Sequence, residues 1–209
     1  MSVDHVEVLV EEPSMKAALE ALLPKLLGDV SFGIRVFQGK PDLLAKLPAR
    51  LTAYARSSID GVRIVVIVDR DAEDCRRLKA KLEEMAERAG LRTRRAARLR
   101  GDCRAWVMLT LIAIEELESW YFGDWAAVRG AFPKVPATVP NQARFRDPDA
   151  IQGGTAEALG SVLARAGYFE GGLPKIQTAR TIAPRMDPAV NRSRSFQVFR
   201  DALMEMMRA

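Results

Sequence analysis

The side chains best suited to chemistry in this sequence are carboxylates, and they fall into three groups. Each group comes after a short apolar run. The groups are Glu11 and Glu12; Asp69, Asp71 and Asp74; and Glu115, Glu116 and Glu118. Carboxylates brought close together raise one another's pKa, and a divalent cation relieves that repulsion. Mg²⁺ or Mn²⁺ held by such oxygens can polarise a phosphoryl group and activate water.

Other kinds of catalytic site are poorly supplied. The chain has two cysteines, Cys75 and Cys103, no CxxC motif, and one histidine, His5. This excludes a disulfide framework and a thiolate zinc site, and it leaves little basis for a histidine triad. No GxxxxGK[ST] motif is present, so the chain shows no ATPase module. Any catalysis must therefore rest on carboxylates, on Lys and Arg, or on hydroxyl groups.

The apolar runs before the acids have the features of strands, and helical patterns separate them. The predicted strands are Val6–Val10, Phe32–Phe37, Val62–Val68, Leu91–Leu99 and Trp106–Ile114. Predicted helices begin at Pro13, at Pro41, after Asp71 as N-cap, and near Glu115. This alternation predicts an α/β fold with a mostly parallel sheet flanked by helices. Because ligands bind beyond the carboxyl ends of parallel strands, the three groups of acids would share one edge.

Each acid also has a simpler interpretation, which the sequence leaves open. Asp71 would cap the helix that follows it, and Asp74 would favour the first turn of that helix electrostatically. Glu116 and Glu118 would be solvated helix positions. The pair Asp69 and Asp71 favours a site more strongly, because a helix cap needs only one acid.

The last third of the chain has a different character. We predict an α/β domain over residues 1–125 and a loop-rich, helical C-terminal extension over 126–209 that packs on it. Residues 133–154 form a predicted loop, followed by helices Thr155–Ala166 and Phe196–Arg208. We expect Ser193 and Ser195 to cap the last helix.

Positive charge is unevenly distributed along the chain. The 209 residues carry a formal net charge of +5, and the segment 88–104 is rich in arginine. A basic face favours phosphate-rich partners, although it also suits a solvated surface. The candidate contacts to a nucleic-acid backbone are Arg92, Arg94, Arg95, Arg98 and Arg100.

The sequence gives no indication of a membrane partner. No apolar run reaches the roughly 18 residues needed to cross a bilayer. The first residues are acidic and do not resemble a signal peptide. We therefore expect a cytoplasmic protein, with self-association left open.

Several short motifs together resemble the Toprim-like superfamily, and within it a family of uncharacterised bacterial proteins related to overcoming-lysogenisation-type nucleases. The resemblance extends from Glu7 to Leu203. The motifs are V-E-E-P-S at Val10–Ser14, V-D-R-D at Val68–Asp71, E-L-E-S-W at Glu116–Trp120, Asp187-Pro188, and S-R-S-F at Ser193–Phe196.

The resemblance implies a Rossmann-like Toprim fold and a Mg²⁺-dependent nuclease. It implies that Glu11 is the catalytic glutamate, that Asp69 and Asp71 bind the metal, and that Glu116 and Glu118 complete the site. Glu12 and Asp74 are further candidates. The resemblance also implies a nucleic-acid substrate, a role in antiphage defence, and a separate AAA-type ATPase as partner.

Two positions depart from the family pattern and support an alternative. Glu12 stands where the family usually has glycine, which would allow close approach of a phosphate. Met15 stands where the family often has an acid. The alternative is a non-catalytic Toprim-fold interaction or sensor module with a degenerate metal site. A receiver-like phosphoacceptor domain fits less well, because Thr110 lies inside its apolar run and no lysine follows that run.

Overall fold

The structure is a computed structural model that describes residues 3–57, 60–71, 73–101, 106–114 and 116–208. Within these residues it contains one sheet of parallel strands in the order β2-β1-β3-β4. The strands are β1 (His5–Val10), β2 (Ser31–Val36), β3 (Val62–Asp69) and β4 (Met108–Ala113). The predicted α/β class with a parallel sheet is confirmed.

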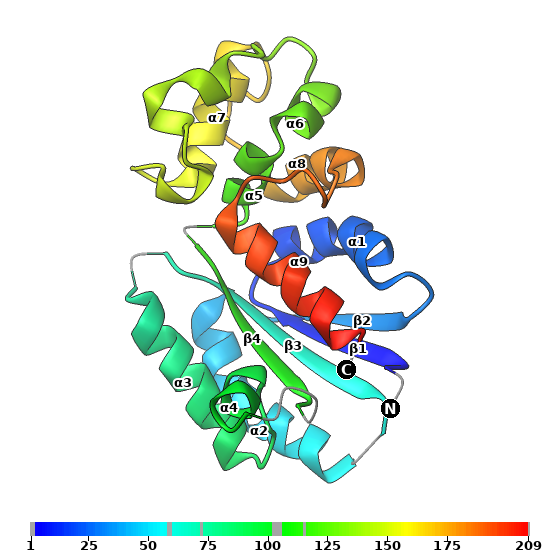
Figure 1. Ribbon diagram of the computed structural model, residues 1–209. Helices are drawn as coiled ribbons and strands as arrows, with labels where there is room; N and C mark the ends of the chain where they lie inside the picture. Colours follow the sequence, from blue (N-terminus) through cyan, green and yellow to red (C-terminus); the bar gives the residue numbers. More distant parts are fainter. Residues whose placement is uncertain (1–2, 58–59, 72, 102–105, 115, 209) are drawn as a thin grey trace.

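Helices cover both faces of the sheet (Figure 1). The helices within the first hundred residues are α1 (Pro13–Leu27), α2 (Lys40–Ser57), α3 (Cys75–Arg88) and α4 (Arg94–Leu99). Those that follow β4 are α5 (Glu118–Gly123), α6 (Trp125–Ala131), α7 (Thr155–Arg165), α8 (Lys175–Ile182) and α9 (Arg194–Met206). In Figure 1, α1 and α9 lie over one face, α2 and α3 lie over the other, and α5 to α8 lie beyond the carboxyl ends of the strands.

The two faces of the sheet are buried in separate apolar clusters. Successive side chains of a strand point to opposite faces, so Val8 and Leu9 enter different clusters. Val8 packs with Leu19 of α1, whereas Leu9 packs with Leu43 of α2 and Leu82 of α3. Burial on both faces explains why β1 and β3 are almost continuously apolar.

The segment 133–154 has no strand or α-helix, in agreement with the predicted loop, but it folds back onto the core. It forms the 3₁₀ turns η1 (Val139–Asn141), η2 (Ala143–Phe145) and η3 (Pro148–Ala150). A further 3₁₀ turn outside this segment, η4 (Ala183–Arg185), follows α8. Phe145 and Ile151 are buried in the same cluster as α1 and α9. That cluster includes residues on both sides of residue 125, and the division of the chain at this point stays a prediction.

Close approach between α5 and the segment before α9 depends on a glycine. A Cβ atom on Gly123 would lie 2.0 Å from Asn191 Oδ1 and 2.7 Å from the backbone nitrogen of Ser193. Ser193 is the N-cap of α9, as expected, and accepts a hydrogen bond from the backbone N–H of Phe196 at 3.2 Å. Trp120 of α5 is buried between the two elements.

Two local predictions were wrong. The segment 91–99 is not a strand, because Thr93 accepts a hydrogen bond from the backbone N–H of Ala96 at 3.1 Å and caps α4 instead. Only an isolated bridge between Thr93 and Met108 pairs this segment with β4. Asp71 is not the N-cap of α3. Asp74 has that role, and its Oδ1 accepts hydrogen bonds from the backbone N–H groups of Arg76 and Arg77 at 2.9 Å.

Among the helices within the described residues, none is long and apolar enough to span a bilayer.

Candidate functional site

Glu11 and Asp69 meet at the carboxyl edge of the sheet. They come from neighbouring parallel strands, since Val10 at the end of β1 pairs with Ile67 of β3. The backbone N–H of Asp69 donates a hydrogen bond to Glu11 Oε1 at 2.5 Å. Both residues are buried, with exposures of 6% for Glu11 and 7% for Asp69. The structure therefore brings the first two groups of predicted acids into contact.

Burial disfavours the charged forms of these carboxylates. It raises the pKa of Glu11 to about 7, although the hydrogen bond from Asp69 opposes the change. Burial, and then the negative charges of Glu11 and Glu118, raise the pKa of Asp69 well above its usual value. Burial also raises the pKa of Glu118 to about 7. Nearby lysine charges oppose the shifts of Glu11 and Glu118 without outweighing burial, and a bound cation would stabilise the charged forms further.

One oxygen of Asp69 is left without a partner. Asp69 Oδ1 is buried and accepts no hydrogen bond from any residue that the structure describes. Such an oxygen costs free energy unless another group satisfies it. It is a hard, anionic donor of the kind that Mg²⁺ binds, so this atom fits a divalent cation.

Lys175 of α8 reaches the acids from the C-terminal part of the chain. Its Nζ lies 3.4 Å from Glu116 Oε1 and 3.8 Å from Glu12 Oε2. Burial lowers the pKa of Lys175, but the negative charges around it outweigh this effect, and the net change is upward. Burial also raises the pKa of Glu116. The hydrogen bond from the backbone N–H of Ala156 and the charge of Lys175 outweigh that effect, so the pKa falls. Glu12 and Glu116 thus share one positive partner from within the chain.

Asp71 forms an ion pair with Lys40. Lys40 Nζ lies 2.6 Å from Asp71 Oδ2 and 3.1 Å from Glu73 Oε1. The side chain of Lys40 is only 8% exposed, whereas that of Asp71 is 57% exposed. Asp71 also has a φ of +50°, which side-chain-bearing residues seldom adopt. The charge of Asp71 still acts on Asp69 and on Glu11, and its role as a metal ligand stays a prediction.

The remaining candidate acids have different surroundings. Glu118 is buried on α5, 1% exposed, and its charge acts on Asp69. Asp74 caps α3. Glu115 lies outside the described residues. Across the described ranges, no three His, Cys, Asp or Glu side chains are grouped closely enough to hold a metal ion. Mg²⁺ often binds through only one or two protein carboxylates and completes its shell with water, so a site with Asp69 and Glu11 as ligands stays a prediction.

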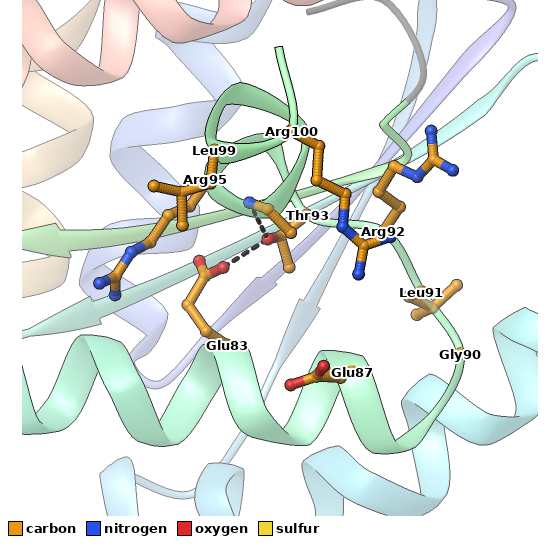
Figure 2. A pocket seen from close by; sticks show the side chains of 10 residues that line it. Glu83, Glu87, Gly90, Leu91, Arg92, Thr93, Arg95, Leu99 and Arg100 are labelled. Atoms are coloured by element: carbon orange, nitrogen blue, oxygen red, sulfur yellow. Dashed lines mark hydrogen bonds between the residues drawn. The ribbon is translucent and has the colours of Figure 1, made fainter. Parts of the chain in front are cut away.

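The candidate arginines surround α4, away from the acids. Arg92, Arg95 and Arg100 line an open hollow of about 530 Å³. Figure 2 shows that their guanidinium groups do not converge: Arg92 and Arg100 lie on one side of Thr93 and Arg95 lies on the other. The hollow is not a preformed site for a single phosphate.

The other two arginines are held by a carboxylate of α9. Glu205 Oε2 lies 2.5 Å from Arg94 Nη2 and 2.6 Å from Arg98 Nη2. Arg94 has a side chain that is 17% exposed, whereas that of Arg98 is 53% exposed. Arg94 therefore contributes to the packing of α4 against α9.

The basic segment lies at the amino ends of the strands and the acids lie at their carboxyl ends. Thr93 pairs with the first residue of β4, Met108, whereas the acids follow its last residue, Ala113. At ~3.3 Å per residue, this separates the two features by roughly 17–20 Å. They can act together only on a ligand long enough to span that distance.

Three residues that the sequence search did not single out for this site belong to it: Lys40, Lys175 and Tyr121. Lys40 comes shortly after the end of β2, so a search of strand ends for lysines as well as acids would have found it. No local pattern marks Lys175, because α8 comes to the acids only through tertiary packing. Tyr121 is buried on α5, and no local pattern marks it for the site either.

Comparisons with known proteins give one family and a set of similar structures. Residues 10–204 match the family described as "Domain of unknown function (DUF4276)". No curated protein matches the chain. The structure is similar to the C-terminal region of the Xanthomonas campestris pv. campestris OLD protein, with 18% identity, a TM-score of 0.47, and 98% of each chain covered. It is also similar to the C-terminal region of the Burkholderia pseudomallei OLD protein, with 18% identity, a TM-score of 0.42, and coverage of 95% of this chain and 98% of that one.

Proposed function

The chain belongs to the DUF4276 family, and from the geometry of its acidic edge we propose that it is a Toprim-like phosphoesterase that depends on Mg²⁺ or Mn²⁺. The observation that carries this proposal is the buried Asp69. Its Oδ1 has no partner among the described residues, and Glu11 contacts its backbone. A protein rarely keeps such an arrangement without a compensating charge.

The residues divide the work as follows. Asp69 and Glu11 would hold the cation, which polarises the phosphoryl group and activates water when it is bound. In the metal-free protein the pKa of Glu11 is about 7, so if Asp69 alone holds the cation, Glu11 is left to serve as the general base. Glu116 and Glu118 border the site. Lys175 brings a positive charge toward the place where an anionic substrate would approach.

Nucleic acid is the substrate class that best fits the rest of the molecule. The formal net charge of +5 favours a polyanion. A polynucleotide is long enough to reach from the acids to Arg95 and Arg100 at the other edge of the sheet. A nuclease role in antiphage defence, with a separate AAA-type ATPase as partner, is the finer form of this proposal and rests on the sequence motifs.

The test is a calorimetric titration of Mn²⁺ into the wild type and Asp69→Asn, followed by assays on DNA and RNA. We expect saturable binding that weakens at least tenfold in Asp69→Asn, and phosphodiester hydrolysis that is lost with it. Asp201→Asn is the matched control, because Asp201 has an exposed side chain and pairs only with its neighbour Arg200. An absence of wild-type binding up to millimolar Mn²⁺ would overturn the proposal.

A second function is favoured by the two lysines at the site. Lys175 forms ion pairs with Glu12 and Glu116, and Lys40 forms one with Asp71. These ion pairs suit a non-catalytic interaction or sensor module, in which lysines take the place of the metal. The same titration separates the two functions, because such a module would bind no Mn²⁺.

A further inference from the structure

Tyr121 has a buried hydroxyl group without a partner. The residue lies on α5, is 0% exposed, and its Oη forms no hydrogen bond with any described residue. Buried tyrosine hydroxyls usually find a partner, because an unpaired buried hydroxyl is costly. This one calls for an explanation.

Tyr121 belongs to the apolar cluster that also includes Val10 and Ala113, at the carboxyl ends of β1 and β4, and Ala113 pairs with Asp69. Tyr121 follows Glu118 by three residues on α5, so the two side chains share a face of the helix. Burial, and then the negative charges of Glu118 and Asp69, raise the pKa of Tyr121 well above its usual value. Both acids are therefore near enough to act on its hydroxyl.

Two unpaired atoms of opposite kind are thus found in one region. Tyr121 Oη is a donor, and Asp69 Oδ1 is an acceptor. Both are buried and unpaired among the described residues, so no direct hydrogen bond joins them. A buried water molecule typically makes about three hydrogen bonds to such groups. The carboxyl group of Glu118 offers the third partner.

We propose that Tyr121 is a positioning residue that donates a hydrogen bond through one buried water to Asp69 Oδ1. This bridge fixes the orientation of the Asp69 carboxylate before the cation binds. The inference rests on the proposed cation site and extends it to a residue that need not touch the metal. Removal of groups that orient metal ligands typically weakens metal binding about 10–100-fold.

The test is Tyr121→Phe, measured by Mn²⁺ calorimetry and by thermal unfolding without metal. We expect Mn²⁺ affinity to fall about tenfold or more. We also expect the metal-free variant to stay folded, with a thermal midpoint within a few degrees of the wild type, because one water-mediated hydrogen bond contributes little to stability. Tyr168→Phe is the control, since the Tyr168 hydroxyl accepts a hydrogen bond from the backbone N–H of Lys134, outside the site.

A double-mutant cycle provides the second measurement. If Tyr121 and Glu118 hold the same water, the effects of Tyr121→Phe and Glu118→Gln on Mn²⁺ affinity will not add. If the wild type binds Mn²⁺ and Tyr121→Phe binds it with the same affinity, this inference is overturned and the proposed function is not. If the wild type binds no Mn²⁺, the proposed function fails, and the inference fails with it. If Tyr121→Phe does not fold, its hydroxyl is needed for the fold itself, which also contradicts the inference.

Discussion

Asp69 is the residue where stability and the proposed function conflict. Its folded-state pKa lies above the ordinary value, so the folded protein favours the protonated form. Without a cation, the contribution of this group is therefore most favourable below the ordinary pKa. It is lost as the pH rises toward the folded-state value. The charged Asp69 should therefore lower the free energy of unfolding of the wild type at neutral and alkaline pH. A neutral side chain at the same position should not.

We predict that Asp69→Asn stabilises the metal-free protein at pH 8 by on the order of 1–3 kcal/mol. The gain should shrink as the pH falls toward 4, because the wild-type carboxyl group then becomes neutral too. Urea unfolding in EDTA at several pH values measures the difference, with Asp201→Asn as the control. A variant that is less stable than the wild type across the whole range would show that the charge of Asp69 is compensated.

At the scale of elements, the start of α9 is held by an acid from another part of the chain. Asp149 Oδ1 accepts hydrogen bonds from the hydroxyls of Ser193 and Ser195 at 2.8 Å and 2.9 Å. Its other oxygen accepts from the backbone N–H groups of Arg194 and Ser195. Ser195 in turn accepts from the indole N–H of Trp120 at 3.0 Å. This network connects η3, α5 and α9.

We predict that Asp149→Ala lowers the free energy of unfolding by about 2 kcal/mol or more, because it leaves several donors without their acceptor. Asp201→Ala, within α9 itself, should change the free energy of unfolding by less than about 0.5 kcal/mol, because Asp201 is an exposed surface position. Thermal unfolding followed by circular dichroism compares the two variants. Equal effects would indicate that Asp149 adds nothing beyond an ordinary surface charge.

For the whole molecule, the apolar core runs across the proposed domain division. Helix α8 packs on α1, and α9 packs on β4 and α5. One apolar cluster includes Leu19 and Leu109 from the first part of the chain and Leu159 and Phe199 from the second. Because both parts bury the same cluster, neither keeps its apolar face covered without the other.

We therefore predict a single cooperative unfolding transition. Tryptophan fluorescence and far-ultraviolet circular dichroism should give the same urea midpoint. A fragment that ends at residue 125 should not fold, because its helix α1 would lose α8 and α9. Two separate transitions, or a folded fragment, would show that the two parts are independent domains.

Local patterns along the chain were sufficient for most elements and for the centre of the site. Apolar runs separated by helical spacing identified β1, β2, β3 and β4 and the parallel α/β class. The expectation that Glu11 and Asp69 would meet followed from the same rule, since neighbouring parallel strands end at one edge. Ser193 as the cap of α9 was also predictable, because a cap depends on residues within one turn. The short segment 91–99 was mistaken for a strand, because so few residues show no clear period.

Tertiary structure decided which charges face one another. The pairing of Lys40 with Asp71, and of Lys175 with Glu12 and Glu116, joins segments far apart in sequence. The burial of Tyr121 beside Glu118 and Asp69 likewise depends on how α5 lies over the sheet. Period and composition specify which face of an element is buried, but not which partner covers it. For this protein, the sequence alone determined that carboxylates share one edge of the sheet. Only the packing of α5 and α8 over that edge decided which acids pair with Lys175 and which ones the proposed cation would have to compensate.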